Sequence, residues 1–180
     1  MFFDWFYPAY LGPVVEGTLN AFLQDDEVVY VCLELLTELV LNRNNRVRFD
    51  TWNINGLIIF KETSKYVVKL LQFWDVLKQK ACSSDEYTQK WRFVKQICIL
   101  YNNVIVGSYI NFAICEYYND DVFTQLSTLV LQMVGCLDVS KLRQYSKVEL
   151  NVYKMLWSFF SSHMELVFMK FDTSLITSLI

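Results

Sequence analysis

Helix-breaking residues are scarce in this chain. Its 180 residues include only 5 glycines and 2 prolines, and the glycines stand apart from one another. Sheet proteins need many more turn residues, and a phosphate-binding loop needs clustered glycines, so the sequence favours neither. Hydrophobic residues make up 54% of the chain and recur at helical spacing. The sequence therefore predicts an all-α protein.

Groups that carry out catalysis are also few. His163 is the single histidine, and no Cys, Asp or second His lies near it at the spacing of metal ligands. We expect His163 to be a satisfied or partly exposed helix residue. The neighbouring carboxylates Asp25/Asp26 and Asp120/Asp121 fall where helices begin, and capping accounts for them. The expectation is a protein with no catalytic residue, no metal and no cofactor, and not an enzyme.

The five cysteines contain no close pair such as CxxC. Four of them lie inside apolar helical patterns, where cysteine behaves as a small buried hydrophobe. Their odd number and wide spacing fit a reducing compartment, with neither disulfides nor zinc.

Charge is distributed unevenly along the chain. Residues 1–30 contain five acidic residues and no Lys or Arg, whereas residues 43–95 contain 11 basic and 5 acidic residues. Two groups of basic residues are candidates for binding an acidic partner: Arg43, Arg46 and Arg48 in a turn, and Lys61, Lys65 and Lys69 along one helix face. Alternatively, the arginines close the turn and the lysines form an ordinary solvated face. The acidic pI of about 5.2 disfavours nucleic acid as a partner.

Hydrophobic periodicity and capping residues predict a series of helices. Their expected ranges are 26–42, 53–80, 86–119 with a bend at Gly107, 120–136, 146–164, and two short helices within 166–180. Across these helices we expect almost complete burial of Leu36, Leu39, Val67, Leu71, Leu126 and Val130. Leu35 is placed on the same inward face as Leu36 and Leu39. The aromatic residues of segment 1–10 would be exposed unless a preceding repeat or the first helix covers them.

One segment raises the question of a membrane. Residues 96–115 carry no charge over a length that can span a bilayer. They also include Gln96, Asn102, Asn103 and Asn111, whose amides are costly in hydrocarbon. Burial inside a helical stack is the favoured interpretation, and membrane association is retained as an alternative.

Two stretches carry a resemblance to a known family. Residues 34–66 read ELLTELVLNRNNRVRFDTWNINGLIIFKETSKY, and residues 107–121 read GSYINFAICEYYNDD. In both stretches the order of residues resembles the exportin-seven branch of the importin-β (karyopherin) superfamily. The likeness is looser over residues 123–180. The resemblance implies a HEAT-like α-solenoid fragment of antiparallel helix pairs, with residues 1–180 forming one segment of a longer array.

The resemblance also implies a function. Members of the superfamily carry protein cargo through nuclear pores under the control of the small GTPase Ran in its GTP form. We therefore expect a segment of an export receptor that shuttles between nucleus and cytoplasm. Its expected partners are cargo, Ran and nuclear pore proteins, with no nucleic acid and no membrane insertion. The alternative is a helical-repeat scaffold with no part in transport.

Overall fold

The computed structural model describes residues 5–23, 25–41, 54–72, 90–107, 110–171 and 176–177. Within these ranges the secondary structure is helical and contains no strand, which confirms the all-α prediction. The elements are the π-helix η1 (Tyr7–Leu11), α2 (Gly12–Phe22), α3 (Asp26–Leu41), α4 (Asn55–Gln72), α6 (Arg92–Val106), α7 (Ala113–Tyr117), α8 (Val122–Gly135), α9 (Val139–Leu142) and α10 (Ser146–Lys170).

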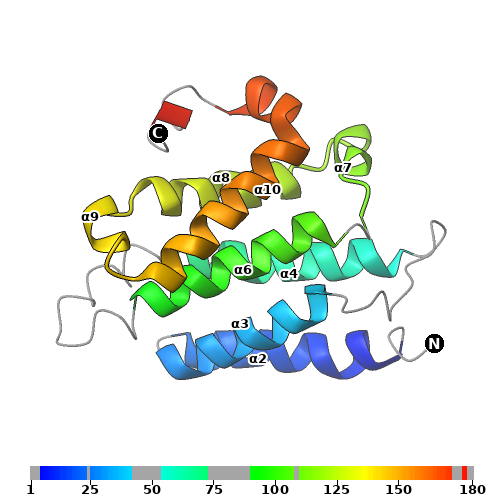
Figure 1. Cartoon of the computed structure of the whole chain (residues 1–180). Coiled ribbons are helices and arrows are strands. Elements are labelled where there is room, and N and C mark those ends of the chain that lie inside the picture. The colour runs from blue at the N-terminus through cyan, green and yellow to red at the C-terminus, as the bar shows by residue number, and fades with distance from the viewer. Residues whose placement is uncertain are drawn as a thin grey trace.

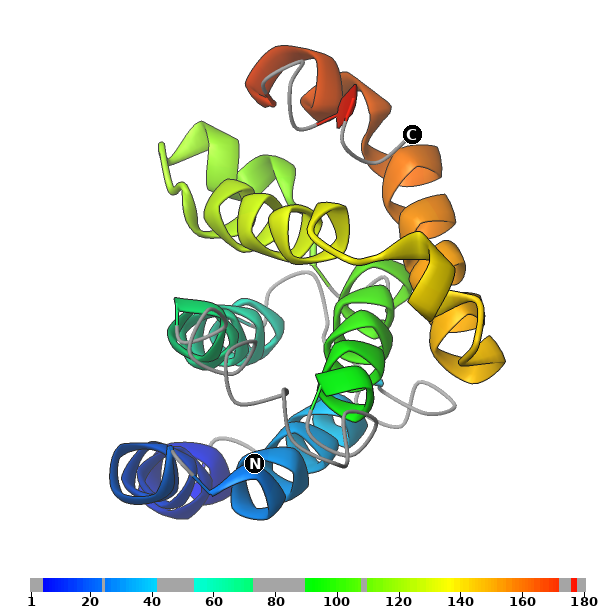
Figure 2. The ribbon, with the colours of Figure 1, turned by 90° about the vertical axis from the view of Figure 1, so that its left-hand side faces the viewer.

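The six longer helices form three antiparallel hairpins, α2–α3, α4–α6 and α8–α10 (Figure 1). Seen along the helices, the hairpins lie one above another in two layers (Figure 2). The first layer consists of α2, α4 and α8, and the second layer consists of α3, α6 and α10. In the second layer α6 packs between α3 and α10, and in the first layer α4 packs between α2 and α8, so each hairpin contacts the next through both of its helices. Stacked helix hairpins of this kind are typical of helical-repeat proteins.

Polar side chains fix where several helices begin. Asp25 Oδ1 accepts hydrogen bonds from the backbone N–H groups of Glu27 and Val28, at 3.2 Å each, so the predicted cap of α3 is confirmed. Asp138 caps α9 in the same way, accepting from Ser140 N at 2.9 Å. These caps satisfy N–H groups that the first turn of a helix leaves without partners.

Parts of the helix prediction are wrong. The helix expected over 86–119 does not run through to Asn119, because α6 ends at Val106 with Gly107 as its C-cap and only the short α7 follows. Glycine and asparagine are weak helix formers, and Asn111 Oδ1 instead accepts a hydrogen bond from Ala113 N at 3.1 Å. The helices η1 and α2, which precede Asp25, were not predicted.

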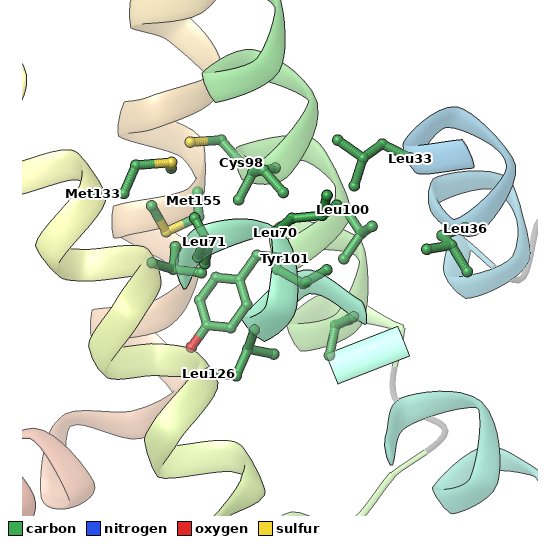
Figure 3. Packing of buried hydrophobic residues seen from close by; sticks show 14 of the residues in the cluster. Leu33, Leu36, Leu70, Leu71, Cys98, Leu100, Tyr101, Leu126, Met133 and Met155 are labelled. Atoms are coloured by element: carbon green, nitrogen blue, oxygen red, sulfur yellow. The ribbon is translucent and has the colours of Figure 1, made fainter. Parts of the chain in front are cut away.

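A single hydrophobic core runs through the stack, with contributions from both layers (Figure 3). Five of the six residues predicted to be buried are confirmed: Leu36, Val67, Leu71, Leu126 and Val130. The sixth, Leu39, is only partly buried, and Leu35 is 40% exposed. The predicted buried face of α3 is therefore wrong. The residues that α3 buries include Val29, Leu33, Leu36 and Val40.

Hydrogen bonds between side chains join the hairpins inside this core. Gln96 Nε2 on α6 donates to Thr37 Oγ1 on α3 at 2.8 Å. The Tyr101 hydroxyl on α6 and Ser127 Oγ on α8 share a hydrogen bond of 2.6 Å. Burial raises the pKa of Tyr101, so this phenol stays protonated. Paired polar groups at fixed positions set the register between neighbouring helices, since a shifted helix would leave them unsatisfied.

Candidate protein-interaction surface

The predicted partner surface consists of a lysine row on α4 and an arginine-rich turn. The lysine row, Lys61, Lys65 and Lys69, lies on α4 in the first layer. The arginines Arg43, Arg46 and Arg48 lie outside the described residues, so the structure does not place them beside the lysines. Their role in binding remains a prediction.

The three lysines differ in what they contact. Lys61 forms an ion pair with Asp120, which stands just before α8. Lys69 donates a hydrogen bond to Asn20 on α2. Lys65, between them, is exposed, and no contact of its ammonium group is found among the described residues. The ends of the row therefore connect α4 to both of its neighbours in the first layer, and within the described ranges Lys65 is the one lysine of the row without such a contact.

The electrostatics of this row follow from the Lys61–Asp120 pair. The ammonium of Lys61 holds the pKa of Asp120 below its usual range, and a hydrogen bond from Val122 N at 3.1 Å acts in the same direction. Asp120 in turn raises the pKa of Lys61. Both groups are charged at neutral pH, so this pair presents no net charge to a partner. The surface around Lys65 is consequently less basic than the sequence alone indicates.

The packing beneath the row also connects α4 to α2. The Tyr66 hydroxyl donates to the Gly12 carbonyl oxygen at 3.1 Å, and burial raises the pKa of Tyr66 to about 12. Together with the Lys69–Asn20 contact, this bond holds the first two hairpins in register. The lysine spacing of four residues thus has a structural role in addition to any role in binding.

The outer face of the second layer carries a hollow that the sequence did not predict. Its volume is about 380 Å³, and it lies between α6 and α10. It is lined by Asn102, Leu150, Tyr153, Lys154, Trp157 and Ser158. Ser158 Oγ of α10 donates to Asn102 Oδ1 of α6 at 2.7 Å and so joins the two helices that line it. Trp157 is 76% exposed at its edge. The sequence does contain a signal for this hollow. Once Val152 and Met155 are assigned to the core, the residues on the other side of α10 form an exposed stripe.

The described residues contain no group of three or more His, Cys, Asp or Glu arranged to hold a metal ion. They likewise include no helix that is both long and apolar enough to cross a membrane. His163 is half-buried on α10, and its Nε2 has no hydrogen-bond partner among the described residues. Its neighbours are the rings of Phe112, Phe123 and Phe159, with centroids 4.9–5.9 Å away. What this part of the chain offers a partner is surface formed by packed helices.

Comparison with known proteins identifies relatives of this helical stack. The chain is 30% identical to mouse Ran-binding protein 17 over 171 residues, which is 93% of the chain. It is 32% identical to exportin-7 of Dictyostelium discoideum over 140 residues, or 78% of the chain. The chain is homologous to a segment of the exportin-7 group of exportins. Ran-binding protein 16 of Drosophila melanogaster, 22% identical over 87% of the chain, is a more distant relative.

The chain spans only part of each exportin relative. It corresponds to 15% of the length of mouse Ran-binding protein 17 and 13% of the Dictyostelium exportin-7. No family model and no solved structure matches the chain. The predicted resemblance to the exportin-seven branch is confirmed, and the relatives are named as exportins and Ran-binding proteins, not as enzymes.

Proposed function

We propose that this chain acts as a segment of an export receptor that carries protein cargo out of the nucleus together with Ran in its GTP form. The observation that carries this proposal is the alignment with Ran-binding protein 17 over 93% of the chain. An alignment that covers all three hairpins relates the whole stack, and not one isolated motif, to the exportin relatives. The receptor would shuttle between nucleus and cytoplasm and contact nuclear pore proteins on the way.

The architecture supports a role in binding proteins. Stacked hairpins present the outer faces of both layers as long, continuous surfaces, which helical-repeat proteins use to wrap partners. On the first layer, Lys65 is exposed on α4, and the described residues include no contact of its ammonium group, so it can meet a carboxylate of a partner. Lys61 and Lys69 hold the helices on either side of it. We assign partner contact to Lys65 first, and to Arg43, Arg46 and Arg48 in the segment that precedes α4 in the sequence.

The decisive experiment compares binding of the chain to two nucleotide states of Ran. The immobilised chain is exposed to Ran loaded with a non-hydrolysable GTP analogue and, separately, with GDP, in biolayer interferometry. A clear preference for the GTP state supports the proposal. A parallel measurement replaces the homologous segment of the Dictyostelium exportin-7 with this chain and follows export of a fluorescent cargo in cells.

The two measurements separate the possible outcomes. Export by the chimaera, with or without Ran binding by the isolated chain, places the segment in the transport machinery. A chimaera that folds but exports nothing, together with equal binding of both nucleotide states, contradicts the proposal. Binding of other proteins without dependence on nucleotide would identify a helical-repeat scaffold instead.

A further inference from the structure

Two neighbouring tyrosines are strongly exposed at the end of α7. Tyr117 is 81% exposed and Tyr118 is 73% exposed. Their rings meet edge to face, with centroids 5.2 Å apart, and neither hydroxyl has a hydrogen-bond partner among the described residues. The pair belongs to the connection between the second and third hairpins, and not to an end of the stack (Figure 1). Both hydroxyls are therefore open to a modifying enzyme.

Acidic residues surround these tyrosines in the sequence. The order EYYNDD places Glu116 two positions before Tyr118, and Asp120 and Asp121 two and three positions after it. No Lys or Arg occurs in residues 96–140. Protein kinases select substrates partly by their charge pattern, and several tyrosine kinases prefer acidic segments. The sequence around Tyr118 has the charge that such a kinase recognises.

A kinase must also draw its acceptor tyrosine into an extended segment, and the local structure here can open easily. The helix α7 has five residues and packs only lightly on the other described helices, so its own hydrogen bonds stabilise it little. Tyr118 lies just past its end, where its N–H donates to the Ile114 carbonyl at 3.1 Å. Asn119 follows at φ 51°, a conformation that opening relieves. The Lys61–Asp120 ion pair then remains as the tie to α4.

Other exposed tyrosines lack this combination. Tyr153 is 53% exposed, but it lies within the 25-residue α10 and has no acidic residue within three positions. Tyr10 is 50% exposed and also has no acidic residue within three positions. Tyr118 alone of these three joins exposure and acidic neighbours to a turn that can open.

We propose that Tyr118 is a phosphorylation site for a protein tyrosine kinase. The kinase transfers the γ-phosphoryl group of ATP to Tyr118 Oη: a bond from this oxygen to phosphorus forms, and the bond from phosphorus to the β,γ-bridging oxygen breaks as ADP leaves. The phenol proton passes to the catalytic aspartate of the kinase. The new phosphate carries about −1.5 to −2 charge and stands two residues from Asp120, so repulsion favours the open turn. Phosphorylation therefore loosens the link that Asp120 makes between α8 and α4.

The first test incubates the full chain with MgATP and the catalytic domain of a tyrosine kinase that prefers acidic substrates. Mass spectrometry then maps phosphate on each tyrosine over time. Phosphate is expected at Tyr118 at least about tenfold faster than at Tyr153, the matched tyrosine within a long helix. Tyr118→Phe should remove the signal, and circular dichroism checks that the fold is retained. Equal rates at Tyr118 and Tyr153, or phosphate at Tyr117 in place of Tyr118, overturn the proposal.

The second test asks whether charge and opening direct the kinase. Asp121→Asn removes an exposed acid beside the site and should slow phosphorylation several-fold. Lys61→Met removes the ion pair to Asp120 and should speed phosphorylation by up to about fivefold, because the turn then opens more readily. Lys65→Met, one turn along α4, is the matched control and should leave the rate unchanged. Unaltered rates in both Asp121→Asn and Lys61→Met contradict the assignment.

Hydrogen exchange measures the consequence for the turn. Amides of residues 113–121 should exchange several-fold faster in the phosphorylated chain than in the unmodified chain, while those of α6 keep their protection. The variant Tyr118→Phe, treated with kinase and ATP in the same way, should show no change. Equal exchange in the phosphorylated and unmodified chains contradicts the proposed loosening.

Discussion

At the scale of single residues, His163 combines several unusual properties. Its backbone leaves the helical region within α10, with φ −132° and ψ 30°. Its ring lies among phenylalanines from three parts of the chain, and Nε2 is buried without a partner among the described residues. Burial lowers the pKa of His163 below its usual value of 6.5. His163, predicted to be a satisfied or partly exposed helix residue, is half-buried in α10 and is neutral at pH 7.

The lowered pKa predicts how stability changes with pH. The unfolded chain takes up a proton at His163 near pH 6.5, while the folded chain does so only at lower pH. The stability associated with neutral His163 is complete above pH 6.5 and falls as pH drops toward the folded-state pKa. Urea denaturation at several pH values should show this fall, and His163→Phe should reduce it. Equal pH dependence in both proteins would mean that His163 is fully solvated.

Burial also decides the effect of truncating core leucines. Leu126 is 1% exposed, in the middle of the shared core. Leu126→Ala should lower the free energy of unfolding by about 2–5 kcal/mol through lost burial and a residual cavity. Leu39→Ala, at the partly buried position on α3, is the matched control and should cost less. Chemical denaturation measures both, and a smaller loss at Leu126 than at Leu39 would contradict the packing described.

At the scale of helices, the junction between α7 and α8 depends on one residue. Asn119 has φ 51°, the only positive value for a residue other than glycine in the described part of the chain. Asparagine tolerates this left-handed conformation better than most residues. The next residue, Asp120, donates its N–H to the Cys115 carbonyl at 2.7 Å and pairs with Lys61 on α4. The turn thus places the carboxylate that joins α8 to the neighbouring hairpin.

Substitutions at Asn119 should report on this turn. Asn119→Val is expected to lower the free energy of unfolding by about 1–2 kcal/mol, because a β-branched side chain is strained at positive φ. Asn119→Gly should have little effect or stabilise slightly, since glycine adopts this conformation without strain. Thermal and urea denaturation of the two variants provide the comparison. Equal stability of the Val and Gly variants would show that the turn does not require a left-handed residue.

The Lys61–Asp120 pair should contribute little stability by itself. Both side chains retain contact with solvent, and exposed pairs of this kind contribute about 0–1 kcal/mol. Its contribution is present above the usual pKa of an aspartate and is lost as pH falls through the lowered pKa of Asp120. Lys61→Met should therefore raise the pKa of Asp120, as followed by NMR titration. An unchanged Asp120 titration would show that the two groups do not interact in solution.

At the scale of the whole molecule, the two layers differ in how their outer faces are used. The first layer presents lysines that partly serve to join its helices, whereas the second layer presents the hollow between α6 and α10. A longer receptor built from such hairpins would keep both faces continuous. Charge on the first layer and aromatic surface on the second would then suit different partners.

Reversing the charge of Lys65 tests the first layer as a binding surface. In the proposed receptor, Lys65→Glu should slow association with an acidic protein partner and leave the fold intact. The effect should shrink with added salt, because exposed charges are screened beyond about 8 Å at physiological ionic strength. Lys95→Glu on α6 makes the same change on the second layer and is the matched control. Surface plasmon resonance at low and high salt measures both, and identical association rates would assign Lys65 to ordinary solvated surface.

The sequence by itself determined the helical class and most of the core. Few glycines and prolines, apolar spacing and an Asp cap predict α3 and α8 close to their observed ranges, and α4 and α10 close to their observed starts, because these signals act within a helical turn or two. The end of α4 expected near residue 80 lies outside the described residues. The family likeness was equally local, carried by residues 34–66 and 107–121. It was enough to indicate the exportin relatives that comparison confirmed.

Only the tertiary structure decided which faces and charges remain available. Hydrophobic periodicity could not predict which face of α3 is buried. A helix with apolar residues on more than one side can bury either side, and the helices packed against it decide which one. The contacts of the lysine row could not be predicted either. Spacing in the sequence places Lys61, Lys65 and Lys69 on one helix face, but the partners of Lys61 and Lys69 are Asp120 and Asn20, from distant parts of the chain. Contacts between residues far apart in sequence follow from how the hairpins stack, and no local pattern encodes them.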